Sequence, residues 1–183
     1  MKVNRWVGLL ITIVVLGSTL LPTDVFAEGK RTIEDETIYD LLVDRYNNGS
    51  GENDIGVDSR DLTAFNGGDF NGIVDRLTHI TDMGFTMVSL GPVFESESYD
   101  GKKVLDYAKL EPHFGTDEEF VKMIDALHAK DLAVITDFPL GGVSEHHVWV
   151  QEGLLKFTPD TDGTIDWEAS DVATQQALQE ALV

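Results

Sequence analysis

The chain has 183 residues and carries 33 acidic against 13 basic side chains, which gives a formal net charge of −20. This charge argues against a nucleic-acid partner, because phosphate binding needs a basic face that displaces counterions. The sequence has no cysteine, which excludes disulfides, a thiolate nucleophile and cysteine-ligated metal centres. A hydrophobic content of 42% is enough for a packed core.

Residues 1–27 have the pattern of a secretory signal peptide. Lys2 and Arg5 form a positive start, an apolar run extends from Trp6 to Leu21, and Val25-Phe26-Ala27 offers a cleavage site. We therefore expect a secreted, extracellular protein whose mature part is residues 28–183. The alternative is an uncleaved membrane anchor, but the apolar run is shorter than the roughly 20 residues that span a bilayer. No second hydrophobic span follows.

The mature sequence opens with a predicted strand, a long loop and a helix. Residues 37–44 form an apolar run that ends in a polar stretch, which indicates a buried strand. Residues 47–68 are rich in Gly, Asn and Asp and have no apolar period, so we expect a loop that is unusually long for a connection. Apolar residues then recur at helical spacing from Ile73 to Ile80, and Gly84 supplies the stop.

Two further strands and a second helix follow. Residues 85–90 form an apolar run closed by Gly-Pro, which predicts a second buried strand, and the polar stretch over 95–109 predicts a loop. Thr116 and Glu119 have the spacing of a capping box, and apolar residues at helical spacing follow it. Residues 132–137 give a third strand, and another helix is expected from Asp171.

The alternation of strands and helices indicates an α/β fold. Parallel strands joined by crossover helices would form either an open doubly wound sheet or a (β/α)8 barrel. Neither glycine-rich phosphate-binding motif is present, so nucleotide binding has no support. A closed barrel takes about 250 residues, which is more than this chain contains.

Four segments, taken in order, resemble the N-terminal part of the α-amylase family of glycoside hydrolases. They are Asp44–Gly49, Gly67–Ile73, Leu110–Thr116 and Val134–Asp137. The resemblance implies the N-terminal portion of a (β/α)8 TIM barrel, with three βα units and a short excursion after the third strand. It also implies action on α-linked glucans or maltodextrins. The chain would then be a fragment that ends before the fourth strand.

The resemblance further implies a calcium ion (Ca2+) in the loop after the first strand. The matching positions are Asn48, Ser50, Asn53, Asp54, Gly67 and Asp69. The composition of the loop suits calcium independently, because this ion takes six to eight oxygen ligands. Ser50 is the weakest of the set, since family members commonly have Asn or Asp there. The alternative is a solvated loop without an ion.

The family's catalytic carboxylates have no counterpart here, and its substrate cleft is altered. The nucleophile and the general acid follow the fourth and fifth strands in the family, so no catalytic residue is assigned in this chain. Asp100 and Lys102 stand where the family commonly has His and Tyr, which removes a ring that stacks on sugar. The positions that match the cleft are Tyr99, Asp100, Lys102 and Asp137. After Asp137, Gly141 and Gly142 replace Asn and His.

Two interpretations follow from these observations. The first is an α-amylase-like hydrolase, of which this segment alone is expected to be inactive. The second is a non-catalytic, secreted glucan-binding or calcium-stabilised relative. The histidines are interpreted as structural: His113 packs in a turn, adjacent His146 and His147 point in different directions rather than binding metal, and His147 with Trp149 supports a loop.

Overall fold

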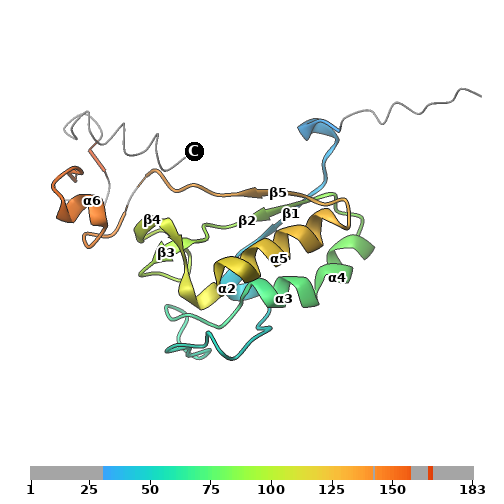
Figure 1. The fold of residues 1–183 in the computed structure, drawn as a ribbon, viewed down its shortest axis with the longest axis horizontal. Helices are drawn as coiled ribbons and strands as arrows, with labels where there is room; N and C mark the ends of the chain where they lie inside the picture. Colours follow the sequence, from blue (N-terminus) through green and yellow to red (C-terminus); the bar gives the residue numbers. More distant parts are fainter. Residues whose placement is uncertain (1–30, 142, 158–164, 167–183) are drawn as a thin grey trace, which may run out of the picture. The chain divides into compact units, whose positions relative to one another are not determined.

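The computed structural model describes residues 31–141, 143–157 and 165–166 (Figure 1). The chain divides into two units between Glu34 and Asp35. Residues 31–34 are the described part of the first unit, and a 3-10 helix, η1 (Ile33–Asp35), begins within them. The predicted signal peptide, Gly142 and the helix expected from Asp171 lie outside the described residues. Across the described ranges, no helix has the length and apolar character needed to cross a membrane.

A three-stranded parallel sheet organises the second unit. Its strands are β1 (Ile38–Leu41), β2 (Met87–Leu90) and β5 (Ala133–Thr136), in the order β1-β2-β5. The three strands pair without a register shift, so their last residues lie side by side at one edge of the sheet. β2 is buried along its whole length, as expected for a central strand. The three predicted strands are confirmed, each shorter than its apolar run.

Helices provide the connections between these strands. After β1 come α2 (Val43–Tyr46), the long loop, α3 (Phe70–Asp75) and α4 (Leu77–Asp82). α5 (Asp117–His128) leads into β5, and it begins with the predicted capping box. Figure 1 shows α3, α4 and α5 together on one side of the sheet.

The helix predicted around Ile73 and Ile80 is two helices rather than one. Arg76 leaves helical geometry, with φ −104° and ψ 9°, and separates α3 from α4. Both isoleucines are nevertheless fully buried. The break therefore redirects the backbone while both helices keep their apolar side chains against the sheet.

The main hydrophobic core lies between the sheet and these helices. Alternate strand residues point into it, because successive side chains in a strand face opposite ways. The strands contribute Tyr39, Leu41, Val88, Leu90 and Val134. The opposite face of the sheet is more open at its two edge strands, where Ile38 and Ile135 are each 42% exposed.

The predicted loop over residues 95–109 is wrong, because this stretch contributes to an antiparallel hairpin. Its strands are β3 (Phe94–Ser96) and β4 (Val104–Leu110), and their pairing contains two register shifts. The polar residues that suggested a loop pair with each other instead. Lys109 Nζ lies 3.4 Å from Glu95 Oε2 across the hairpin and 3.3 Å from Asp106 Oδ2 on its own strand.

A second hydrophobic cluster lies beneath this hairpin. It joins Val104 and Tyr107 of β4 to residues after β5, among them Val143 and Leu155. The expected excursion after the third strand is partly described, and its described residues include a short helix, α6 (Val148–Gln151). The hairpin and the excursion thus share a core that is separate from the one beneath the sheet.

Candidate functional site

A cavity of about 440 Å³ lies where the parallel strands end. Leu42 follows β1, Gly91 follows β2 and Asp137 follows β5, while the turn of the hairpin contributes Asp100 and Lys102. The volume falls within the range of small-ligand pockets. The carboxyl ends of parallel strands are also where open sheets and barrels of this class bind their ligands. Three of the four predicted cleft residues therefore line one cavity.

An ion pair forms one wall of the cavity. Lys102 Nζ lies 3.2 Å from Asp100 Oδ2, and the Lys102 backbone N–H donates to the same carboxylate. Burial opposes ionisation of Asp100, but hydrogen bonds from Ser98 and Lys102 outweigh it, so the pKa of Asp100 lies below its ordinary value. Gly101 between them has φ +69°, and a Cβ there would lie 2.5 Å from Pro92 Cβ. Only glycine allows this turn to pack so closely against the cavity wall.

Asp137 enters the cavity from the loop after β5. Its backbone N–H donates to Leu90 O at 2.9 Å, which continues the pairing of β5 with β2. Tyr107 then fixes the following residues, because its hydroxyl donates to Pro139 O and its ring stacks on Phe138 at 4.8 Å. Burial raises the pKa of Tyr107 to about 12, so its hydroxyl keeps its proton over the whole neutral range. No described group donates a hydrogen bond to the Asp137 carboxylate.

Tyr99 does not line the cavity, although the sequence places it at a cleft position. Its ring lies beneath the guanidinium of Arg45, 3.9 Å from the ring centroid, in cation–π geometry. Arg45 also donates to Leu62 O and Ala64 O, at 2.9 and 2.8 Å. Tyr99 therefore contacts the residue that holds the long loop.

The predicted metal loop is organised around the buried carboxylate of Asp69. This carboxylate accepts hydrogen bonds from the backbone N–H groups of Gly49, Ser50 and Gly72. The last of these makes Asp69 the N-cap of α3. The Asp69 side chain thereby joins the start of the loop to α3, the helix that follows the loop. Asp69 is only 1% exposed.

Three other predicted ligand positions lie together. Asn48 Nδ2 lies 2.9 and 3.0 Å from the two carboxylate oxygens of Asp54. Gly67 has φ +88°, and a Cβ there would lie 2.6 Å from Asn48 Nδ2 and 2.7 Å from Asp54 Oδ1. The structure therefore brings Asn48, Asp54 and the Gly67 backbone into direct proximity.

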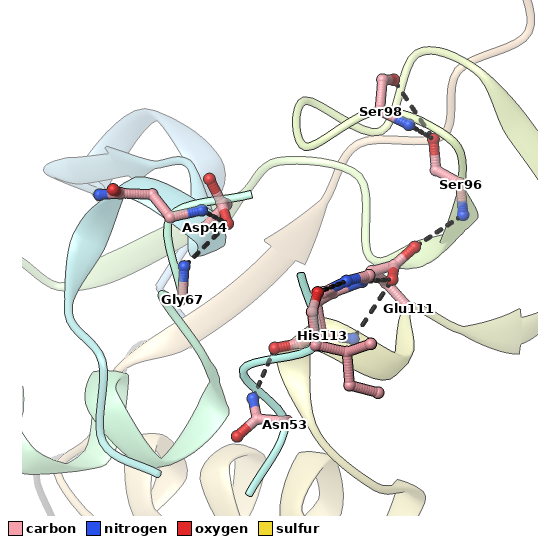
Figure 2. Close-up of polar contacts among 9 residues, drawn as sticks. Asp44, Asn53, Gly67, Ser96, Ser98, Glu111 and His113 are labelled. Carbon is pink, nitrogen blue, oxygen red and sulfur yellow. Dashed lines mark hydrogen bonds and ion pairs between the residues drawn. The ribbon is translucent and has the colours of Figure 1, made fainter. Parts of the chain in front are cut away.

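Ser50 and Asn53 make local contacts in the same loop. Ser50 Oγ accepts from the backbone N–H of Glu52 at 3.3 Å. Asn53 Nδ2 donates to His113 O, and Figure 2 shows the amide oxygen of Asn53 on the side away from His113. Among the described residues, no three acidic or histidine side chains form a cluster that could hold a metal. Any cation in this loop would therefore depend on amide, hydroxyl and backbone oxygens as well as carboxylates.

Sequence reasoning missed two buried carboxylates beside the loop, which Figure 2 shows. Asp44 is 1% exposed and accepts from the N–H groups of Asn66 and Gly67; burial raises its pKa despite these bonds. Glu111 is 2% exposed and bonds the His113 ring and the Ser96 N–H. One sequence feature could have predicted the burial of Glu111: it is a lone carboxylate between an apolar residue and a Pro-x-Phe-Gly turn.

The adjacent histidines have different environments, as expected. His146 is exposed and pairs through Nδ1 with Glu97 Oε1 at 2.7 Å, beside a hydrogen bond from Ser144 to the same carboxylate. His147 is fully buried, and its ring lies against Tyr107 and Trp149.

Comparisons with known proteins agree with this arrangement. Residues 40–173 match the family model described as alpha amylase, catalytic domain. Trehalose synthase/amylase TreS of Mycobacterium tuberculosis is 37% identical over 93 residues, which cover 50% of this chain and 16% of the relative. Beta/alpha-amylase of Paenibacillus polymyxa is 30% identical over 129 residues, which cover 67% of this chain and 10% of the relative.

A solved structure gives the same result in three dimensions. The crystal structure of an Anoxybacillus alpha-amylase superposes with a TM-score of 0.67 and 36% sequence identity, and the match covers 76% of this chain and 32% of that one. The chain therefore spans at most about a third of the length of these three relatives.

Proposed function

Because the chain belongs to the alpha-amylase family, we propose that its cavity is part of the substrate cleft of a glycoside hydrolase that acts on α-linked glucans. The observation that carries this proposal is the meeting of Asp100, Lys102 and Asp137 in one cavity at the carboxyl ends of the strands. These are positions that match the family's cleft. The names of the relatives, which include amylases, support the same substrate class.

Glucan binding at this cavity is expected to depend on Asp137. Its carboxylate has no described donor, so it is available to accept a hydrogen bond from a sugar hydroxyl. Replacing Asp137 by Ala should weaken the binding of maltoheptaose about 10-fold or more, because hydrogen bonds to charged groups contribute about 1.5–3 kcal/mol. Isothermal titration calorimetry measures this directly. Asp125→Ala, on the exposed face of α5, is the matched control and should leave Kd unchanged. An unchanged Kd for Asp137→Ala would contradict the assignment.

Residues 28–183 alone are expected to release no reducing sugar from starch. In the family, the nucleophile and the general acid follow the fourth and fifth strands, whereas β1, β2 and β5 correspond to the first three. The assay compares this segment with a complete alpha-amylase on the same starch. Reducing sugar above the enzyme-free blank would show that the segment holds its own catalytic pair.

A non-catalytic glucan-binding protein is the second candidate. It is favoured by the Asp100–Lys102 ion pair, which replaces a stacking ring with two charges that already satisfy each other. It is also favoured by Gly141, because a glycine supplies no side chain that could bind a sugar at this position. The space around it is open, since an added Cβ would meet no atom within 4 Å. Binding of maltoheptaose by the full-length protein, without turnover of starch, would identify this candidate.

We further propose that the loop over residues 48–69 binds Ca2+. The predicted set offers two carboxylates, two side-chain amides, a hydroxyl and a backbone carbonyl, which is the chemistry that calcium prefers. The contacts of Asn48, Asp54 and Gly67 support the fit, because a turn of the Asn48 amide would place its oxygen beside the Asp54 carboxylate. Such an ion would stabilise the folded conformation of this loop. It would have no part in the hydrolysis of the glycosidic bond.

Secretion is proposed from the signal-peptide pattern of residues 1–27. N-terminal sequencing of protein recovered from the culture medium should begin at Glu28. Recovery of the uncleaved chain with the membrane fraction would favour the anchor instead.

A further inference from the structure

We propose that Glu111 and His113 form a positioning pair that holds the loop over residues 48–69 in the shape its cation requires. The inference rests on the proposed calcium site. It adds that two residues outside the loop hold the loop in position for the ion. Neither residue is among the predicted ligands. Both lie at the start of η2 (Pro112–Phe114), the turn that leads from the hairpin to α5.

His113 contacts the loop at three separate places. Its Nε2 lies 2.8 Å from Ile55 O, and its own carbonyl accepts from Asn53 Nδ2. Its ring also stacks on Phe65, with centroids 3.7 Å apart and planes within 5°. Asn53 and Ile55 belong to the first limb of the loop and Phe65 to the second. One side chain therefore joins both limbs, and both candidate carboxylate ligands lie within four residues of these contacts.

Glu111 fixes the orientation of that ring. Its Oε1 lies 2.5 Å from His113 Nδ1 and also accepts the His113 backbone N–H, while Oε2 accepts from the Ser96 N–H at 2.7 Å. A carboxylate that is 2% exposed and bonded on both oxygens has little freedom to move. Because a carbonyl only accepts, the ring nitrogen that faces Ile55 O must carry a hydrogen. Contacts therefore run without a break from Ser96 through Glu111 to His113, as Figure 2 shows, and from the His113 ring to Ile55 O.

The contact with Asn53 relates the pair to metal binding. His113 O holds the amide nitrogen of Asn53, which leaves the amide oxygen on the opposite side, available as a ligand (Figure 2). Asp54 follows at once and carries the carboxylate that Asn48 contacts. Outer residues that orient the ligands of a metal typically change its affinity 10- to 100-fold when they are replaced. The same range is expected here.

The test uses the full chain and measures two quantities: the affinity for calcium, and the hydrogen exchange of the loop when no metal is bound. His113→Ala should raise the Kd for Ca2+ about 10-fold or more in isothermal titration calorimetry, and Glu111→Gln should do the same by releasing the ring. His113→Gln keeps one donor and should recover part of the affinity. In EDTA, hydrogen exchange of residues 48–66 should be faster in His113→Ala than in the wild type, while α6 is unchanged.

His146→Ala is the matched control, because it also breaks a histidine–carboxylate pair, but one that joins the segment after β5 to Glu97 rather than to the loop over residues 48–69. It should leave the Kd for Ca2+ and the exchange of residues 48–66 unchanged. A purely structural role would lower the melting temperature of His113→Ala with the wild-type Kd, and that result overturns the inference. If the wild type itself binds no calcium, the proposed metal site fails. Loop exchange equal to that of the wild type in EDTA would then overturn the positioning role as well.

Discussion

Replacing Gly72 by Ala is expected to destabilise the protein by about 3 kcal/mol, although glycine-to-alanine changes inside exposed helices stabilise by about 1 kcal/mol. A Cβ at this position in α3 would lie 1.8 Å from Asn47 O, and a Cβ on Gly49 would lie 2.3 Å from the Gly72 backbone N. The loop backbone thus passes directly against the helix. Since the contact atoms are backbone, they cannot move aside as a flexible side chain would. Urea unfolding followed by circular dichroism measures the change.

Gly51→Ala is the matched control for this experiment. Gly51 lies in the same loop without a left-handed φ, and its nearest atom to an added Cβ is Asp54 Oδ2 at 3.8 Å. Its unfolding free energy should change by less than about 0.5 kcal/mol. A Gly72→Ala protein as stable as Gly51→Ala would mean that the loop does not pack against α3 in solution.

The second large effect is expected from His147 as the pH falls. Burial of the imidazole lowers the pKa of His147 to about 4, and the negative charge of Asp106 opposes this only in part. His147 Nδ1 accepts the Trp149 N–H at 3.0 Å, so protonation would place two donors against each other at the start of α6. In the unfolded chain the same group titrates near 6.5.

The sign of the pH dependence follows from these two pKa values. Between pH 6.5 and 4 the unfolded chain binds the proton and the folded chain does not, so acid favours unfolding. The stabilisation is complete above pH 6.5 and is lost as the pH falls toward 4, by about 3 kcal/mol over the whole interval. Urea titrations at half-unit pH steps measure it.

A comparison of variants separates His147 from the carboxylates that titrate at the lower end of this range. His147→Phe keeps a ring within the second cluster and should flatten the profile between pH 6.5 and 5. His128→Phe, at the exposed end of α5, should keep the wild-type slope. Equal slopes in the two variants would show that His147 is not the responsible group.

Local signals explain why much of the fold could be predicted from the sequence. The three strands lie in short, mainly apolar runs, and the capping box of α5 needs only Thr116 and Glu119 at the right spacing. The hairpin was missed because β4 has polar residues, and Lys109 among them pairs with Glu95 on β3. The composition of a segment does not show such pairing between strands. The break at Arg76 was missed because the apolar spacing continues through it.

The candidate site divides in the same way. Asp100, Lys102 and Asp137 could be placed by their family motifs, because each lies close in sequence to the end of a strand or hairpin. Tyr99 shares that neighbourhood, but its ring direction is decided by Arg45, which is distant in sequence. The burial of Glu111 and the contacts of His113 arise only when the long loop folds back on η2. Their interpretation as a simple turn was therefore incomplete.

The separation of the two hydrophobic clusters has a consequence for which substitutions this protein can accept during evolution. The turn that carries Asp100 and Lys102 lies between β3 and β4, and the Lys102 side chain is 79% exposed. Substitutions of Asp100 or Lys102, unlike those of Gly101 between them, remove no side chain from either cluster, so they should reduce the free energy of unfolding little. We therefore expect single substitutions at Asp100 or Lys102 to change the chemistry of the cavity wall, while the strands that position the cavity stay under strict packing constraint.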